Sequence, residues 1–403
     1  MRINPERLIA DLRRLAEFGK AGTGVDRTSY SAHDIASREW LVGRMREAGL
    51  DAAIDAVGNA RGVTREANRA VVIGSHTDSV PKGGWLDGAM GVIYGLEIAR
   101  ARREAGRAAK LGVDVVSFQD EEGTYLPCLG SRAFCSDLPA AELAAAKSQS
   151  GETLAGAIAR VGYGGARWER DPRRHVAYLE AHIEQGPRLE TEHKRIGVVT
   201  GIVGIRRFRI TAAGQADHAG TTPIAMRKDA ARGLYELAHR VHREFPALAS
   251  ADTVWNVGVM NVRPGAANVV PAAADMVVEF RDTASAVLDR IEAELTGWVA
   301  ALDGKAGVKI SAAPIARILP TLMDDRLADL IDAVAAAHAA PAMRMPSGAG
   351  HDAMIVGRVM PAGMLFIPSI GGRSHDIVED TDEADIVLGC ELLADVVERL
   401  ETS

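Results

Sequence analysis

Histidines and carboxylates, the side chains that commonly bind catalytic metal ions, lie beside glycines or directly after short apolar runs at five places. These places are His76, Asp87, the acidic run 120–122, His182 and His375. In an open α/β sheet the carboxyl ends of the strands leave a crevice in which such ligands can meet. Histidine and carboxylate ligands without thiolate suit zinc, manganese, cobalt or nickel, and the ligand types do not choose among these metals. The pattern indicates a metal-dependent centre, in which Asp78 would hold the far ring nitrogen of His76.

Each of these features also has a common structural explanation. A single histidine at a strand end is more often a hydrogen-bonding residue than a ligand. A pair of glutamates is usually a solvated surface, and an aspartate before a glycine is usually a turn or cap. The combination of all five favours the catalytic interpretation. Cys128 is interpreted as a packing residue, since no histidine or asparagine partner pattern surrounds it.

The hydrophobic pattern predicts the elements that must position these side chains. The apolar runs 71–74 and 113–118 predict strands, and small and apolar residues recur at helical spacing over 88–103 between them. Further helices are predicted over 4–18 and 31–48. Strands that alternate with helices indicate an α/β domain built on a central sheet.

The middle of the chain has a different pattern. Strands predicted over 206–211, 253–262, 274–281 and 308–312, with helices over 228–245 and 284–302, follow the order β-α-β-β-α-β. This order is typical of a small ferredoxin-like α+β unit. We therefore predict a discontinuous α/β domain of residues 1–206 and 318–403, interrupted by an inserted domain of residues 207–317. Two domains also agree with a length of 403 residues.

The composition of the chain argues against some classes of binding partner. A formal net charge of −7 argues against a nucleic-acid binder, because phosphate contacts need a basic face. No stretch approaches the ~20 apolar residues of a membrane span, and the first residues contain no apolar signal core. The three cysteines form no disulfide or zinc framework. We expect a cytoplasmic protein that acts on a small molecule, with neither nucleic acid nor a membrane as partner.

Longer motifs surround the candidate residues. They are Gly-Ser-His-Thr-Asp-Ser-Val at 74–80, Gly-Gly-Trp-Leu-Asp-Gly-Ala at 83–89, Asp-Glu-Glu-Gly at 120–123, Leu-Gly-Ser-Arg-Ala-Phe at 129–134, His-Ile-Glu-Gln-Gly-Pro at 182–187, His-Ala-Gly-Thr-Thr-Pro at 218–223 and Pro-Ser-Gly-Ala-Gly-His-Asp-Ala at 346–353. The first two resemble the signature of the aminoacylase/carboxypeptidase superfamily of two-metal hydrolases. The others resemble its hydantoinase/carbamoylase branch, which contains N-carbamoyl-L-amino acid hydrolases, β-ureidopropionase and allantoate amidohydrolase.

The resemblance implies two divalent metal ions in each subunit and a central mixed sheet. The scheme of the branch assigns the first ion to His76 and His182 and the second ion to Glu122 and His375, with Asp87 bridging both. Two adjacent divalent ions would make the attacking water more acidic and polarise the scissile carbonyl.

The resemblance also implies roles around the metals. Glu121 would be the general base, and His218 would stabilise the oxyanion, reaching the site from a partner subunit. Contacts with the substrate would come from Gln185, Asn268, Arg281 and His351. The inserted domain would serve as a lid and as the interface of a symmetric homodimer.

Two of these assignments have a plain alternative. Arg281 ends an alternating strand and could bind a carboxylate bidentately, but it could equally be a surface arginine that pairs with Asp282 or Glu279. Asn268 closes the segment 264–268, which reads as a loop, and it could be an ordinary turn residue.

The leading functional hypothesis is hydrolysis of an N-carbamoyl-L-amino acid to the amino acid, ammonia and carbon dioxide. The segments 124–128 and 376–380 depart from the commoner pattern of the branch near the pocket, so the exact substrate does not follow. Allantoate or another ureido acid is the close alternative. An aminoacylase, a dipeptidase and a non-catalytic binding homologue are more remote ones.

Overall fold

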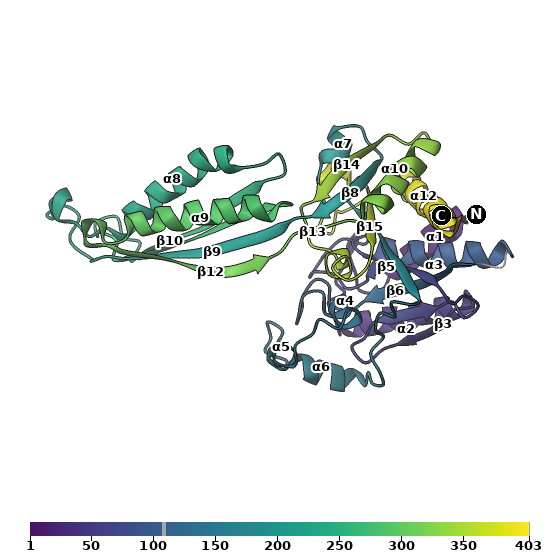
Figure 1. The fold of residues 1–403 in the computed structure, drawn as a ribbon. Helices are drawn as coiled ribbons and strands as arrows, with labels where there is room; N and C mark the ends of the chain where they lie inside the picture. Colours follow the sequence, from purple (N-terminus) through teal and green to yellow (C-terminus); the bar gives the residue numbers. More distant parts are fainter. Residues whose placement is uncertain (107–109, 403) are drawn as a thin grey trace. The chain divides into compact units, whose positions relative to one another are not determined.

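The computed structural model describes residues 1–106 and 110–402, which form two compact units (Figure 1). The first unit comprises Met1–Thr200 and Leu322–Ser403, and the second comprises Gly201–Thr321. The second unit extends a few residues beyond the predicted 207–317 segment at both ends. Its first strand begins earlier and its last strand ends later than their alternating patterns indicate.

A mixed sheet forms the centre of the first unit. Its strands are β3 (Asp51–Ile54), β4 (Ala60–Val63), β5 (Ala70–His76), β6 (Gly112–Phe118), β7 (His175–Ile183), β8 (Ile196–Ile202), β13 (Thr321–Leu322), β14 (Ala342–Ser347) and β15 (Ala362–Ile367). They lie in the order β13-β8-β15-β7-β5-β6-β4-β3, with β14 paired to β8. The strands β15, β7, β5 and β6 are parallel, and antiparallel strands flank them. The predicted central mixed sheet is confirmed, and its parallel strands bring their carboxyl ends to one edge.

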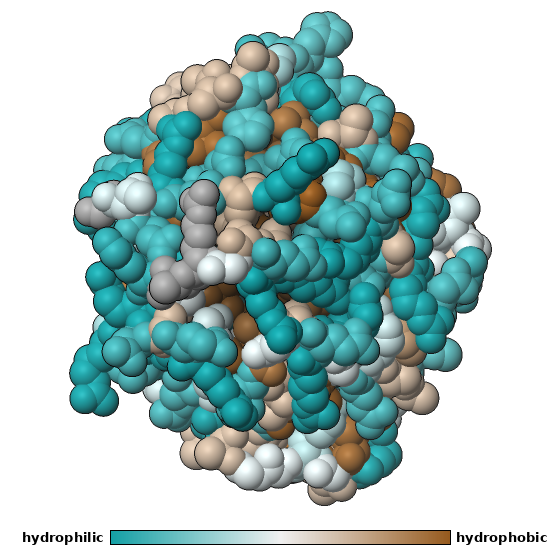
Figure 2. Space-filling model, turned by 90° about the vertical axis from the view of Figure 1, so that its right-hand side faces the viewer, coloured by the Kyte–Doolittle hydropathy of each residue, from teal (hydrophilic) through white to brown (hydrophobic). Residues whose placement is uncertain are grey.

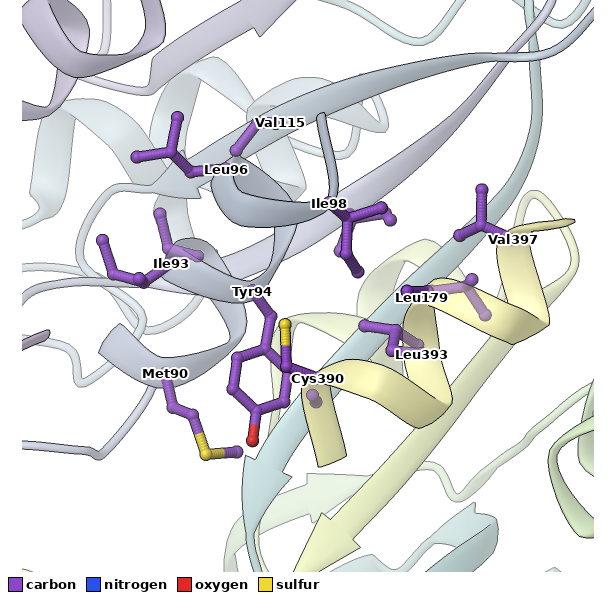
Figure 3. Close-up of a cluster of buried hydrophobic side chains, with 14 of the residues drawn as sticks. Met90, Ile93, Tyr94, Leu96, Ile98, Val115, Leu179, Cys390, Leu393 and Val397 are labelled. Carbon is purple, nitrogen blue, oxygen red and sulfur yellow. The ribbon is translucent and has the colours of Figure 1, made fainter. Parts of the chain in front are cut away.

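Helices of the first unit cover this sheet. They are α1 (Pro5–Ala16), α2 (Ala32–Glu47), α3 (Ala89–Glu104), α4 (Leu129–Phe134), α5 (Ala140–Ala145), α6 (Leu154–Val161), α7 (Arg188–Thr191), α10 (Asp325–Ala337), α11 (Asp352–Val356) and α12 (Glu383–Thr402). A short hairpin of β1 (Lys20–Ala21) and β2 (Gly24–Val25) precedes α2, and a 3₁₀ turn η3 (Ile370–Gly372) follows β15. Figure 3 shows side chains of α3, among them Tyr94 and Ile98, close to Cys390 and Leu393 of α12. Val115 of β6 and Leu179 of β7 belong to the same buried cluster, so apolar burial holds both helices against the sheet.

The second unit has the strand and helix order β-α-β-β-α-β. Its elements are β9 (Gly204–Ala213), the 3₁₀ turn η1 (Ile224–Met226), α8 (Ala230–Leu248), β10 (Val254–Arg263), β11 (Ala273–Asp282), α9 (Ser285–Leu302), the 3₁₀ turn η2 (Lys305–Gly307) and β12 (Lys309–Ile318). The sheet order is β10-β11-β9-β12 with antiparallel pairs, and α8 and α9 lie on one of its faces (Figure 1). Phe208, Phe280 and Trp298 belong to the core between helices and sheet. This is the ferredoxin-like arrangement.

Hydrophilic residues cover most of the face shown in Figure 2, and hydrophobic residues are scattered among them. Scattered apolar residues are normal on a protein surface. Among the described residues no helix combines the length and the apolar character needed to cross a lipid bilayer.

Candidate metal centre

The carboxyl edge of the parallel strands collects the candidate ligands of the first unit. His76 is the last residue of β5, and His182 lies near the end of β7. Glu122 follows β6, and Asp87 lies in the loop between β5 and α3. His375 follows η3 after β15, so residues far apart in the sequence meet at one edge.

The first group of candidate ligands consists of His76, Asp87 and His182, all buried. The Nε2 atom of His182 lies 3.1 Å from Asp87 Oδ1, and the Nε2 atom of His76 lies 3.9 Å from the same oxygen. The second group consists of Asp87, Glu122 and His375. The Nε2 atom of His375 lies 3.4 Å from Asp87 Oδ2 and 3.7 Å from Glu122 Oε1. Asp87 therefore belongs to both groups and turns one carboxylate oxygen toward each.

A close approach of the main chain to His76 explains why glycine follows Asp87. A Cβ atom at Gly88 would lie 2.4 Å from Cδ2 and Nε2 of His76, and Gly88 has a φ of 62°. A side chain here would displace the imidazole and strain the backbone. Glycine at this position keeps the loop of Asp87 against the end of β5.

The two buried histidines both turn Nε2 toward Asp87. The Nδ1 atom of His182 lies 2.9 Å from the Ile183 carbonyl oxygen, and that of His76 lies 2.9 Å from the Asp78 carbonyl oxygen. In its neutral form, a ring that donates Nδ1–H to a carbonyl has its lone pair on Nε2, where a metal ion can bind.

Asp78, the predicted partner of His76, contacts the imidazole through its main-chain carbonyl and not through its carboxylate. The Asp78 carboxylate lies 3.9 Å from His76 Nδ1 and instead accepts the backbone N–H groups of Asp120 and Glu122, at 3.1 and 3.3 Å. Arg38, which is fully buried, also contacts this carboxylate at 3.5 Å. Asp78 thus ties the end of β5 to the loop after β6, and its main-chain carbonyl orients His76.

Electrostatics at this edge favour a bound cation. Burial, and then the charge of Asp87, raise the pKa of Glu122 well above its usual range. The Oε1 atom of Glu122 is buried and has no hydrogen-bond partner among the described residues. A buried carboxylate oxygen without a hydrogen bond is costly unless a cation lies beside it. The donor types, the crowded carboxylates and this unsatisfied oxygen all fit divalent metal ions.

The pKa values of Asp87 and His182 are shifted in the directions that favour their charged forms. Burial opposes ionisation of Asp87, but a hydrogen bond with His182 and the nearby charges of His182, His76 and His375 hold its pKa below the usual range. Burial also works against a charged His182, yet its contact with Asp87 raises its pKa to about 9. His182 and Asp87 thus form an ion pair, and a metal ion that bound Nε2 of His182 would have to displace the proton on that nitrogen.

Glu121 lies beside the first group. Its Oε2 atom is 3.6 Å from His76 Nε2, and the Cys128 thiol lies 3.9 Å from its Oε1 atom. Burial, followed by the charges of Glu122 and Asp352, raises the pKa of Glu121 well above its usual range. A carboxylate with a raised pKa can accept and return a proton. Burial also raises the pKa of Cys128, which agrees with a packing role for this thiol.

Two of the predicted substrate residues lie at the same edge. The Nε2 atom of Gln185 lies 3.4 Å from both oxygens of Asp87 and 3.2 Å from Ser374 Oγ. The ring of His351 meets that of His182 edge-on, with centroids 4.5 Å apart, and its Nε2 lies 2.8 Å from Ser347 Oγ. Burial, followed by the charge of His182, lowers the pKa of His351 well below its usual value. His351 is therefore a neutral group beside the ligands.

The remaining predicted residues belong to the second unit. His218 pairs with Val269 in an isolated bridge, and the Ala219 N–H donates to the Asn268 carbonyl, so His218 and Asn268 lie in adjacent loops. Arg281 lies near the end of β11 and pairs with Glu279, with Nη2 and Oε1 2.7 Å apart. This is one of the two surface pairings that the sequence allows for Arg281.

One residue of this edge was not predicted as a site residue. Glu379 is buried and accepts hydrogen bonds from the backbone of the Asp87 loop and from Ser374. The segment 376–380 stands out in the sequence only as a departure from the commoner pattern. Spacing alone does not associate Glu379 with Asp87, which lies 292 residues earlier.

Comparisons with known proteins identify relatives that match nearly the whole chain. The family model described as peptidase family M20/M25/M40 matches residues 72–399. An N-carbamoyl-L-amino-acid amidohydrolase of Paenarthrobacter aurescens is 35% identical over 98% of this chain and 98% of its own length. An allantoate amidohydrolase of Bacillus subtilis is 31% identical over 96% of this chain and 95% of its own length.

A solved structure gives the same result. An amidase of the hydantoinase/carbamoylase family from Burkholderia phymatum is 46% identical, with a TM-score of 0.93 over 100% of this chain and 98% of its own. The resemblance carried by the sequence motifs is thus confirmed. The chain belongs to peptidase family M20/M25/M40 and, within it, to the hydantoinase/carbamoylase group of amidases.

Proposed function

We propose that the protein hydrolyses the ureido bond of an N-carbamoyl-L-amino acid and releases the amino acid, ammonia and carbon dioxide. The observation that carries the proposal is the Asp87 carboxylate, which faces two ligand groups at once while Glu121 lies beside the first. The relatives named as N-carbamoyl-L-amino-acid amidohydrolases support this substrate class over nearly the whole chain.

The proposed ligands are His76 and His182 for one divalent ion, Glu122 and His375 for a second, and Asp87 for both. When bound, such ions polarise a carbonyl and make water more acidic. Zinc, manganese, cobalt and nickel all suit the donor set.

The proton transfers belong to the residues of the chain. Glu121 takes a proton from the attacking water, whose oxygen forms a bond with the ureido carbon. The bond between this carbon and the amino-acid nitrogen then breaks, and Glu121 returns the proton to that nitrogen. The carbamic acid that remains breaks its own C–N bond and gives ammonia and carbon dioxide. Its buried position beside His76, where ionisation is disfavoured, suits a carboxylate that must hold a proton between these steps.

A second copy of the chain is part of the proposal. Within the second unit, His218 and Asn268 lie in loops beyond the Ala273 end of β11, whereas Arg281 lies near its other end. At about 3.3 Å per residue these ends are separated by roughly 25 Å, which no small substrate spans. If all three residues contact one substrate, they must come from two copies of the second unit.

The edge strand β10 is the proposed interface of this homodimer. It is an edge strand of the described four-stranded sheet, and Val254, Val259 and Met260 on it are exposed. A long apolar edge strand is a natural site for pairing with a second chain. We propose that the second unit also serves as a lid, as the family resemblance implies.

We also propose a cytoplasmic location. Cys128, Cys135 and Cys390 are all free thiols, and free cysteines are usual where the compartment is reducing.

An ammonia-release assay tests the proposed function. Purified protein loaded with manganese is offered N-carbamoyl-L-amino acids, allantoate and N-acetyl amino acids, and a chelated sample is the control. We expect ammonia from N-carbamoyl-L-amino acids, none after chelation, and recovery when a divalent ion is added back. A preference for allantoate, after which the Bacillus subtilis relative is named, would select the alternative ureido acid. Full activity in protein shown by elemental analysis to be metal-free would refute the metal-dependent mechanism.

A further inference from the structure

Glu379 connects the two chain segments that carry Asp87 and His375. Its Oε1 atom accepts the backbone N–H groups of Leu86 and Asp87, at 3.3 and 3.1 Å. Its Oε2 atom accepts the Ser374 hydroxyl at 2.7 Å, and Ser374 directly precedes His375. One carboxylate thus holds the backbone of one proposed ligand, Asp87, and the side chain of the residue that precedes another, His375.

Gln185 closes these contacts into a ring. Its Nε2 atom donates to Ser374 Oγ at 3.2 Å and to both Asp87 oxygens at 3.4 Å. The hydrogen bonds therefore run from Asp87 through Glu379, Ser374 and Gln185 back to Asp87. The ring holds Asp87 from its main chain and from its side chain at the same time.

The Glu379 carboxylate is closely packed. Glu379 is 1% exposed, and a Cβ atom on Gly84 would lie 1.8 Å from its Oε1 atom. The ion pairs among residues 1–106 and 110–402 include none with Glu379. A buried anion with hydrogen bonds but no paired arginine or lysine is costly unless a positive charge lies nearby. Metal ions on Asp87 and His375 would be such a charge.

We propose that Glu379 is a positioning residue that sets Asp87 and His375 for the second metal ion, acting through Ser374 and Gln185. This inference rests on the proposed metal-dependent function. Partners of this kind, which hold the ligands without touching the metal, typically change metal affinity or activity 10–100-fold when they are removed. A residue that only fastened two loops would change stability and leave metal binding alone.

Titration of metal-free protein with Mn²⁺ measures the proposed role without any substrate. Glu379→Gln keeps the shape and removes the charge, and we expect one of two Mn²⁺ ions to bind about 10–100-fold more weakly. Gly84→Ala should have the same effect, because it displaces the carboxylate without changing its charge. Ser374→Ala should also weaken that ion, whereas Ser374→Thr, which keeps the hydroxyl, should bind like the wild type.

Asp55→Asn is the matched control. Asp55 is also a buried carboxylate that accepts loop N–H groups, from Val57 and Asn59, but it belongs to neither ligand group. The Asp55→Asn substitution should lower the Tm of the metal-free protein and leave both Mn²⁺ affinities unchanged. Two sites of wild-type affinity in Glu379→Gln, or equal losses of affinity in Glu379→Gln and Asp55→Asn, would overturn this inference alone. A wild-type protein that binds no Mn²⁺ would overturn the proposed function with it.

Discussion

Glu121 and Glu122 are neighbours in the sequence, but their carboxylates face different histidines. Glu121 Oε2 lies 3.6 Å from His76 Nε2, whereas Glu122 Oε1 lies 3.7 Å from His375 Nε2. Backbone contacts set this divergence, since the Glu122 N–H donates to Asp78 and the Cys128 N–H donates to the Glu121 carbonyl. Two residues with the same chemistry can therefore have separate tasks.

Replacement of each glutamate by glutamine should separate these tasks. Glu121→Gln keeps the side-chain shape and removes the proton carrier, so turnover should fall by ~10²–10⁴-fold while two metal ions still bind. Glu122→Gln should instead empty one metal position, because an amide is a poor ligand for these ions. Elemental analysis and turnover of both variants test the assignment. A metal lost from Glu121→Gln and kept by Glu122→Gln would reverse the two roles.

The metal-free protein should lose stability as the pH rises from about 5 to about 9. Burial, followed by Asp87, raises the pKa of Glu379 from 4.5 to about 8, so the penalty for its ionisation is absent below 4.5 and complete above 8. Burial opposes the charge on His182, but Asp87 raises its pKa from 6.5 to about 9. Its contribution is therefore fully present below 6.5 and lost as the pH passes 9. The raised pKa values of Glu121 and Glu122 also lower the stability as the pH rises. The lowered pKa of His351 has the opposite effect, but only below pH 6.5.

Thermal unfolding at a series of pH values measures this dependence. With a chelator, Tm should fall over the range, and added Mn²⁺ should raise Tm more at high pH because bound ligands must release their protons. A metal-free Tm that rises from pH 5 to pH 9 would contradict the assignment of these buried groups.

Removal of Arg281 should weaken the reaction of substrates that carry a carboxylate. The expected loss in transition-state stabilisation is about 2–5 kcal/mol if substrate binding buries the ion pair. The structure pairs Arg281 with Glu279, so a substrate carboxylate would have to compete with this glutamate. The kcat/KM values of Arg281→Ala for acid substrates and for the matching amides decide the role. Equal losses for both would assign Arg281 to the stability of the sheet.

Mixing two inactive variants tests whether His218 acts on the site of a partner subunit. In a heterodimer of His218→Ala with Glu121→Gln, one site combines an intact Glu121 with the partner's intact histidine. Random exchange makes about half of the dimers mixed, each with one intact site, so activity should recover to about a quarter of the wild-type value. No recovery in a sample shown to contain heterodimers, or an active enzyme that is strictly monomeric, would exclude the shared site.

The sequence by itself determined which residues could carry the chemistry. His76, Asp87, Glu122, His182 and His375 stand beside apolar runs or glycines, and the structure brings their ligand atoms into two groups that share Asp87. This could be predicted because parallel strands place their carboxyl ends at one edge, whatever the loop lengths between them. The β-α-β-β-α-β order of the second unit was readable for a similar reason, since strand and helix periodicities are local.

Only the tertiary structure decided which atoms form hydrogen bonds with one another around the candidate metal centre. That His76 is held by the Asp78 carbonyl depends on hydrogen bonds that the Asp78 carboxylate makes with the loop after β6. The contact of Glu379 with the Asp87 loop joins residues 292 positions apart. Such contacts are set by how strands and loops pack in space, and no local periodicity records them. For that reason the residue types could be read from the chain, whereas the ring of hydrogen bonds around Asp87 could not.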